Sequence, residues 1–281
     1  MHLTITNQEE RFAAMIYRRS VLKKGVAKIV VVGLALLSGA MAHGGLNIIF
    51  DTDMVSDFDD VGAMAALHAM ADAGQCEIIA VGTCSRGNSS VAAVEIFNSF
   101  YGRPGIPVGC SKDIGVVVVP EGRNPKGHQK YVDLAAAYPE WVKHANSDDA
   151  PDANEVYRKA LSGVPDKSVI VCSVGFLTNM RRLLESKPDR YSKLDGRALV
   201  AKKVHSWYAM ACMYPDKKEY NVVGDVESAR IAFEKWPTPI IFLDWNYGVD
   251  VYSGRRVAET EYAYRNPVKD VFVKCLPPRS A

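Results

Sequence analysis

Apolar runs alternate with segments of helical spacing along the chain after residue 45. The runs are continuous, and continuous apolar runs are typical of parallel strands that are covered on both faces. Strands are expected at residues 46–50, 77–83, 107–109, 168–174, 203–211 and 240–243. Helices are expected at residues 59–73, 91–101, 154–161, 178–186 and 226–235. The pattern predicts an α/β fold with an open, mostly parallel, Rossmann-like sheet flanked by helices.

Residues 111–150 interrupt this alternation. They carry Gly, Pro and Asn early and a Ser-Asp-Asp run late, so we expect an irregular loop. Long loops inside compact domains are often lids or binding loops. His128 in this loop is a candidate to serve a leaving group, with a solvated loop histidine as the alternative. We expect His68, on the apolar face of the helix at 59–73, to be a hydrogen-bonded core residue and not a ligand.

The first 42 residues have the plan of an export signal. A basic stretch at residues 18–24 precedes an apolar core at 29–37 and an Ala-Met-Ala site at 40–42. The paired arginines at 18 and 19 resemble a twin-arginine signal. The apolar core is too short for a comfortable membrane span, although an uncleaved anchor or a buried helix stays open. We therefore expect an exported protein, periplasmic or secreted, with no stable membrane span after cleavage.

Composition narrows the function classes for the remaining residues. The chain has 281 residues, 48% of them apolar, which is enough for one core, and no linker follows residue 45, so residues 43–281 are expected to form one domain. The net charge is only +2 and the basic excess lies in the leader, so nothing indicates a nucleic-acid partner. The six cysteines form no C-x-x-C pair, so we expect buried thiols and no structural zinc site, with disulfides left open.

The strongest chemical signal is an acidic loop directly after the first expected strand. Residues 51–60 read Asp-Thr-Asp-Met-Val-Ser-Asp-Phe-Asp-Asp. Clustered carboxylates repel one another and are costly to desolvate unless they are paired or bind a cation. Hard cations prefer such oxygen ligands, and open α/β sheets bind ligands at strand ends. Helix capping would use only one or two of these side chains, so the loop predicts a metal or catalytic site.

One interpretation of this loop is a phosphatase. Residues 51–55 fit the D-x-D-x-[TV] loop of haloacid-dehalogenase-type phosphatases, in which the first Asp attacks phosphorus with magnesium bound. Those enzymes usually take further acidic ligands from a late strand. Here Asp57, Asp59 and Asp60 follow at once. A magnesium-dependent phosphatase therefore stays as the alternative.

A second interpretation accounts for four segments in order. The chain resembles the inosine–uridine-preferring nucleoside hydrolases over about residues 46–250. The matching segments each follow an expected strand: Asp51-Thr52-Asp53 with Asp59-Asp60, Gly87-Asn88, Gly175 to Asn179 (the family's G-x-L-T-N), and Glu219-Tyr220-Asn221 with Asp225. Two extra residues separate Asp53 from the acidic pair, as in a family branch with a longer loop. The insertion leaves open which of Asp57, Asp59 and Asp60 fills each role.

The resemblance implies an activity, a cofactor and a site. It implies calcium-dependent hydrolysis of the N-glycosidic bond of a small-molecule ribonucleoside to base and ribose, as used in purine and pyrimidine salvage. Asp53 would be the catalytic base and a metal ligand, with Asp60 and the Thr178 carbonyl as further ligands. The substrate-binding residues would be Asp59, Asn88, Glu219 and Asn221. Taken alone, Thr178 could be a helix cap, Asn88 a turn residue, and Glu219 and Asn221 solvated loop residues.

The C-terminal end departs from the family. The last family motif, which supplies another Asp ligand and in some members a His for the leaving base, does not occur before residue 281. We therefore expect a C-terminally truncated chain that is poorly soluble and nearly inactive. Asp244 is a candidate substitute ligand, and Asp270 is expected on the surface of a helix. An exported, non-catalytic nucleoside- or ribose-binding protein is the non-enzyme alternative, and a homo-oligomer stays open.

Overall fold

The computed structural model describes residues 45–54, 58–85, 89–113, 125–214, 218–251 and 253–276, without the side chains of 125–128. These residues form a six-stranded, all-parallel sheet in the order β3-β2-β1-β4-β5-β6. The strands are β1 (Leu46–Thr52), β2 (Cys76–Thr83), β3 (Val108–Cys110), β4 (Val169–Ser173), β5 (Val204–Met210) and β6 (Ile240–Leu243). The predicted α/β fold is confirmed. The predicted signal peptide, residues 1–42, lies outside the described residues.

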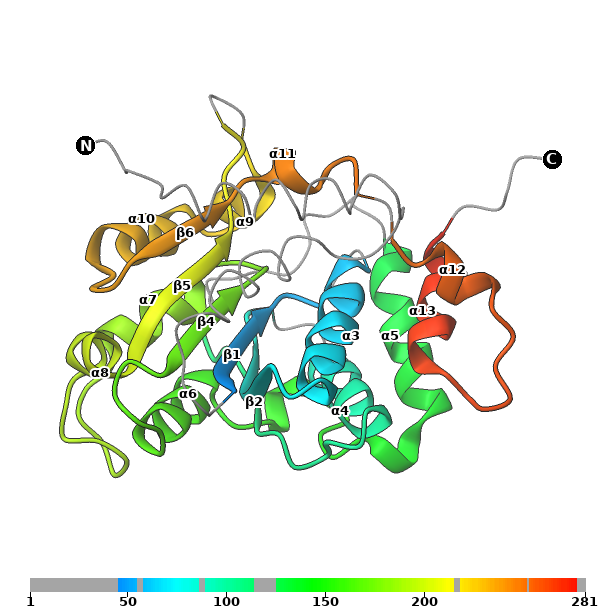
Figure 1. The fold of residues 1–281 in the computed structure, drawn as a ribbon, viewed down its shortest axis with the longest axis horizontal. Coiled ribbons are helices and arrows are strands. Elements are labelled where there is room, and N and C mark those ends of the chain that lie inside the picture. The colour runs from blue at the N-terminus through cyan, green and yellow to red at the C-terminus, as the bar shows by residue number, and fades with distance from the viewer. Residues whose placement is uncertain are drawn as a thin grey trace.

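Helices cover both faces of the sheet (Figure 1). One face is covered by α3 (Asp59–Asp72) and α4 (Ser90–Phe100), and on these helices pack α5 (Pro125–Ala137), α13 (Pro267–Cys275) and, through α13, α12 (Arg255–Glu259). The other carries α6 (Ala153–Ser162), α7 (Thr178–Glu185), α8 (Gly196–Lys203) and α10 (Val226–Lys235). The short helices α9 (Tyr220–Gly224) and α11 (Trp245–Gly248) follow β5 and β6. Within the described residues, no helix is long and apolar enough to cross a membrane.

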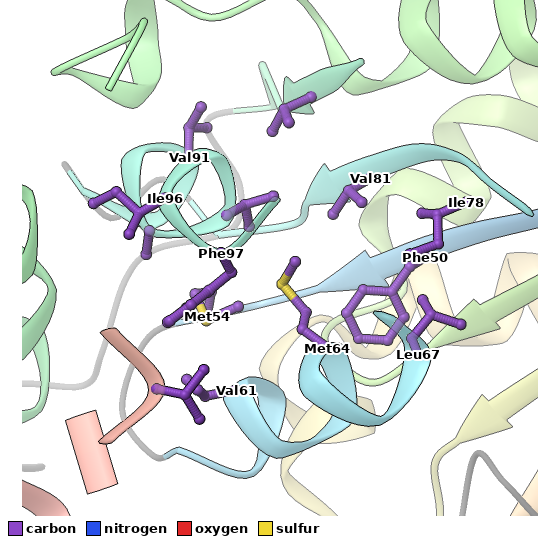
Figure 2. Packing of buried hydrophobic residues seen from close by; sticks show 14 of the residues in the cluster. Phe50, Met54, Val61, Met64, Leu67, Ile78, Val81, Val91, Ile96 and Phe97 are labelled. Atoms are coloured by element: carbon purple, nitrogen blue, oxygen red, sulfur yellow. The ribbon is translucent and has the colours of Figure 1, made fainter. Parts of the chain in front are cut away.

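The central strand β1 supplies side chains to two apolar cores. Ile48 and Phe50 belong to the core under α3 and α4, whereas Ile49 belongs to the core under α6 and α7. Figure 2 shows Phe50 close to Met64 and Leu67 of α3. Because β1 is buried on both faces, its apolar run has to be continuous, which is the pattern that predicted it.

The prediction of an irregular loop over residues 111–150 is wrong in part. Residues 125–137 form helix α5, and two 3-10 turns follow at Pro139–Trp141 and Ser147–Asp149. Tyr131, Leu134 and Tyr138 are buried at helical spacing, so the periodic signal is present but short. Helix α8 was also not predicted.

The chain order creates a switch point beside β1. From β1 the chain runs outward to β2 and β3, then returns to β4 on the other side of β1 and continues to β5 and β6. In open α/β sheets, ligands bind outside the carboxyl ends of the strands where the order reverses. The acidic loop follows β1, so it begins at that crevice.

Candidate functional site

The carboxylates after β1 differ in exposure. Asp51, Asp53 and Asp60 are 0%, 5% and 3% exposed, whereas Asp59 is exposed. The Thr52 hydroxyl donates to Asp60 Oδ1 and so ties the end of β1 to the first turn of α3. Negative charge in a first turn is favoured by the helix dipole. The sequence neighbours Asp59 and Asp60 therefore occupy different environments, because Asp59 faces solvent and Asp60 is buried at the end of β1.

Gly175 brings the segment after β4 against the end of β1. A Cβ at Gly175 would lie 2.6 Å from the Asp53 backbone nitrogen and 2.6 Å from Cys84 Sγ. The Val174 backbone N–H also donates to the Asp51 carbonyl, at 2.8 Å. Since any side chain at position 175 would collide with these atoms, a glycine is required for this close approach. Two of the predicted motifs thus meet at the switch point.

Asp51 is held from the other face of the sheet. The Tyr157 hydroxyl and the Asn179 amide (2.8 Å) donate to its Oδ2, and Tyr157 passes where a side chain on Gly82 would stand. Burial raises the pKa of Asp51 to about 7, although the bonds from Tyr157 and Asn179 oppose the rise. A buried carboxyl with this clamp supports the loop. It lacks the exposure that the nucleophile of a phosphatase needs.

Thr178 links the starts of two helices. It is the first residue of α7, fully buried, and its hydroxyl donates to Asp225 Oδ2 at 2.6 Å. Asp225 in turn caps α10 by accepting from the Ser228 backbone N–H at 3.1 Å. The cap position of α7 is Leu177, so the alternative of Thr178 as a capping residue is wrong.

Glu219 and Asn221 are buried, so the alternative that they are solvated loop residues is wrong. Glu219 caps α9 by accepting from the backbone N–H groups of Asn221 and Val222, at 2.8 and 3.1 Å. Burial raises the pKa of Glu219 while these N–H groups lower it. The Asn221 amide donates to the carbonyls of Val174 (3.1 Å) and Met210 (3.3 Å). Asn221 therefore joins the carboxyl ends of β4 and β5.

The other predicted positions lie outside the described residues or have their own local contacts. Asp57 and Asn88 lie outside the described residues, as does the side chain of His128. Asp244 caps α11, with Oδ1 accepting from the Asn246 N–H at 2.8 Å and Oδ2 from the Tyr214 N–H at 2.5 Å. These local bonds explain Asp244 without a ligand role, which stays a prediction. Asp270 is exposed on α13, as predicted.

Cys84 shows that the carboxylates lie near one another. Burial raises the pKa of its thiol, and the charges of Asp51, Asp53 and Asp60 raise it further. Within the described ranges, no group of three His, Cys, Asp or Glu side chains is arranged to hold a metal. The oxygen ligands that the resemblance implies are Asp53, Asp60 and the Thr178 carbonyl. In kind, carboxylate and carbonyl oxygens fit a hard divalent cation.

Sequence reasoning gave no role to several residues that hold the site together. Asn179 is part of a quoted motif, and its position directly after Thr178 was the available signal. The sequence carries no signal for Tyr157, because Tyr157 reaches Asp51 across 106 positions of the chain.

All six cysteines are free thiols, and Cys76, Cys84, Cys110 and Cys172 are buried. His68 is buried and bonds Asn98 Oδ1 through Nε2 at 3.0 Å, so its predicted core role is confirmed.

Comparison with solved structures shows the same fold. The effector protein XOO4466 is 17% identical, with a TM-score of 0.65, over 88% of this chain and 68% of that chain. The type III effector protein XopQ, complexed with adenosine diphosphate ribose, is 16% identical, with a TM-score of 0.60, over 89% and 70%. The plant nucleoside hydrolase PpNRh1 is 19% identical, with a TM-score of 0.55, over 82% and 69%.

Among the curated proteins, none matches the chain. A family model matches residues 48–277, which includes β2 to β6, all of β1 except its first two residues, and each of the segments that meet at the switch point. That model describes the inosine-uridine preferring nucleoside hydrolases. The chain therefore belongs to the inosine-uridine preferring nucleoside hydrolase family.

Proposed function

We propose that this chain hydrolyses the N-glycosidic bond of ribonucleosides, giving free base and ribose. The observation that carries the proposal is the meeting of three motifs at the switch point. Gly175 lies against Asp53, and Asn221 donates to the carbonyl of Val174, one residue before Gly175. The family binds small-molecule nucleosides, so this crevice is the place where a nucleoside would be held.

Asp53 is the residue proposed to take the proton from the attacking water. It lies at the end of β1, is 5% exposed, and cannot withdraw because Gly175 packs against its backbone and Cβ. A carboxylate fixed in this way is a suitable general base. Departure of the base leaves an oxocarbenium-like sugar, which nearby carboxylates stabilise by their negative charge.

The family is typically metal-dependent, and we propose calcium as the ion. The residues that would hold it are Asp53, Asp60 and Thr178 through its carbonyl. When bound, calcium would lower the pKa of a water and draw in the ribose hydroxyls. Two hydrogen bonds hold two of these proposed ligands in place. The Thr52 hydroxyl donates to Asp60 Oδ1, and the Thr178 hydroxyl donates to the carboxylate of Asp225.

The remaining residues are proposed to bind the ribose. Asp59 is exposed beside Asp60, and Asn88 follows β2 in the sequence. The Asn221 amide nitrogen is used by two strand-end carbonyls, which leaves Oδ1 as the acceptor for a sugar hydroxyl. Oε2 of Glu219 accepts from the backbone N–H groups of Val222 and Cys212, whereas Oε1 accepts from that of Asn221, so Oε1 is the oxygen proposed to accept from a sugar hydroxyl. Amide and carboxylate groups together suit a diol.

Product analysis tests the reaction type. The chain is incubated with inosine or with a phosphomonoester, in calcium, in magnesium and in a chelator. We expect hypoxanthine and ribose from inosine, dependent on calcium, and no phosphate. Phosphate release that disappears in Asp51→Asn would favour the phosphatase alternative. Tight binding of ribose or inosine without turnover would favour the non-catalytic alternative.

We also propose that the chain is exported. The basic stretch, apolar core and Ala-Met-Ala site of residues 18–42 support this. Protein isolated from its native host should begin at His43 when its N-terminus is sequenced. Soluble cytoplasmic protein that retains Met1 would contradict the proposal.

A further inference from the structure

A cavity lies on the side of α3 that faces away from the switch point. Its volume is about 630 Å³, and Gly62, Ala65 and Asp72 of α3 line it. Asp60 precedes Gly62 by two positions, which is about 200° around a helix. The cavity and the carboxylate site therefore use different faces of α3. A volume of this size is typical of small-molecule sites.

The cavity has walls of aromatic side chains from two distant segments. Phe100 and Tyr101 end α4, and Tyr262 and Tyr264 precede α13. The ring centroids of Phe100 and Tyr264 are 6.2 Å apart, and those of Tyr262 and Tyr264 are 5.5 Å apart. Tyr101 stacks on the buried ring of His68, with centroids 4.6 Å apart and planes inclined by 16°. These contacts hold the rings in place, and fixed aromatic faces bind planar rings by stacking.

Polar groups converge on the same cavity. Burial raises the pKa of Tyr101 to about 12, and the charges of Asp72, Tyr262 and Tyr264 add to the rise, so these groups lie near its hydroxyl. Asn266 also lines the cavity. Its Oδ1 accepts from two backbone N–H groups of α13, which leaves its amide nitrogen as a donor. Rings beside a few donors and acceptors are the usual make-up of a site for a heterocyclic ligand.

The charges around the cavity are already paired. Arg103 donates to Asp72 at 2.7 Å. The Lys269 ammonium lies 5.9 Å from the Tyr262 ring centroid and donates to the Thr260 carbonyl at 2.9 Å. An aromatic cage for an ammonium ligand needs open ring faces and an uncompensated carboxylate. The paired charges therefore favour a neutral ligand over a cation.

We propose that this aromatic cavity is a second binding site, for a neutral planar heteroaromatic molecule between a nucleobase and a nucleoside in size. Tyr264 is the residue that the ligand would stack on, because it is 60% exposed at the cavity and contacts both Phe100 and Tyr262. The site is independent of the hydrolase reaction, since none of its residues belongs to the switch-point group.

Calorimetric titration of adenine into the full chain, at pH 7.5 in a chelator, tests the proposal. Tyr264→Ala should weaken binding by about 10-fold or more through the lost stacking. Tyr264→Phe, which keeps the ring, should stay within about 3-fold of the original chain. The matched control is Tyr247→Ala, because Tyr247 is 72% exposed on α11 and does not line the cavity, so binding should not change.

Two further arms separate this site from the others. Asp53→Asn should keep adenine binding, and Tyr264→Ala should keep any hydrolysis of inosine. If Asp53→Asn removes adenine binding while Tyr264→Ala does not, adenine occupies the switch-point crevice and the proposal is overturned. Binding of tetramethylammonium in place of adenine would overturn it too. A chain that binds adenine as described but releases no base would refute only the proposed hydrolase activity.

Discussion

The two faces of helix α3 meet two different kinds of site. At its first turn, Asp60 joins Asp53 in a crevice of buried oxygen atoms at the ends of β1 and β4. On its other face, Asp72 is paired with Arg103 beside stacked aromatic rings. The first site brings together the carboxylates of Asp53 and Asp60, and in the second the Asp72 carboxylate is paired with Arg103. Helix α3 therefore separates the site proposed to bind a cation and a diol from the cavity proposed to bind a flat neutral ring.

Each site is backed by a buried titratable group. Asp51 stands behind Asp53, and burial raises its pKa to about 7. His68 stands behind Tyr101, and burial lowers its pKa to about 4. Both shifts favour the neutral form, because burial penalises charge. In both sites, the residues proposed to contact a ligand lie next to a buried polar residue that is itself held by hydrogen bonds.

The largest effect is expected from breaking the contact that assembles the first site. In Gly175→Ala the new Cβ would lie 2.6 Å from both the Asp53 nitrogen and Cys84 Sγ, so the end of β1 has to move. We expect the free energy of unfolding to fall by about 1–3 kcal/mol, and nucleoside cleavage to fall by about 100-fold. Urea denaturation and a base-release assay measure the two losses.

Gly105→Ala is the matched control, because a Cβ at Gly105 would meet no atom within 4 Å. It should be neutral or slightly stabilising. Normal stability and activity in Gly175→Ala would contradict the close approach of the two loops.

The second effect is expected in the pH dependence of stability, from the buried side chain of His68. Its pKa is about 4 when folded against 6.5 as the ordinary value, so the unfolded chain binds the proton more tightly. Stability from this group is complete above pH 6.5 and is lost as the pH falls toward 4. Between pH 7 and pH 4.5, the free energy of unfolding of the original chain should therefore fall by about 2–3 kcal/mol more than that of His68→Gln. Urea denaturation at the two pH values measures this difference.

His205 provides the control, since it is exposed on β5. His205→Gln should follow the pH dependence of the original chain. If His68→Gln does the same, His68 is not held in its neutral form behind Tyr101.

A smaller effect is expected at the clamp on Asp51. Tyr157→Phe removes the hydroxyl that donates to Asp51 Oδ2 and leaves the Asn179 amide at 2.8 Å. Because the buried carboxyl then has one hydrogen-bond donor fewer, the substitution should lower the free energy of unfolding by about 1–2 kcal/mol. Tyr138→Phe removes a similar bond to the exposed carboxylate of Asp270, and this should cost less. Equal costs in the two variants would mean that burial does not make the bond to Asp51 more important than the bond to Asp270.

The position of the acidic residues at the end of β1 could be predicted from the sequence because these residues directly follow an apolar strand. Asp51, Asp53 and Asp60 follow an apolar run that had to be buried on both faces, and parallel strands bring their carboxyl ends to one edge. The strand bounds agree with the prediction within one or two residues, and Ile240–Leu243 agrees at both ends. Local pattern and topology carry this part of the information.

The supporting contacts and the aromatic cavity could not be predicted in this way. Phe100 and Tyr264 lie in unremarkable segments more than 160 positions apart, and only packing brings their rings together. Tyr157 can reach Asp51 only because Gly82 has no side chain on the intervening strand. Helix α5 was missed because its apolar positions, Tyr131 and Leu134, span little more than one turn before Tyr138. Such features depend on long-range contacts that no short window contains.

The rate of hypoxanthine release from inosine in calcium tests the central claim, which is that Asp53 at the switch point is the catalytic base. The comparison is between the original chain, Asp53→Asn, and Asp250→Asn, which changes an exposed carboxylate outside the crevice. The account predicts weak but measurable release, reduced by about 100-fold or more in Asp53→Asn and unchanged in Asp250→Asn. Release that persists in Asp53→Asn, or that falls equally in both variants, would contradict it.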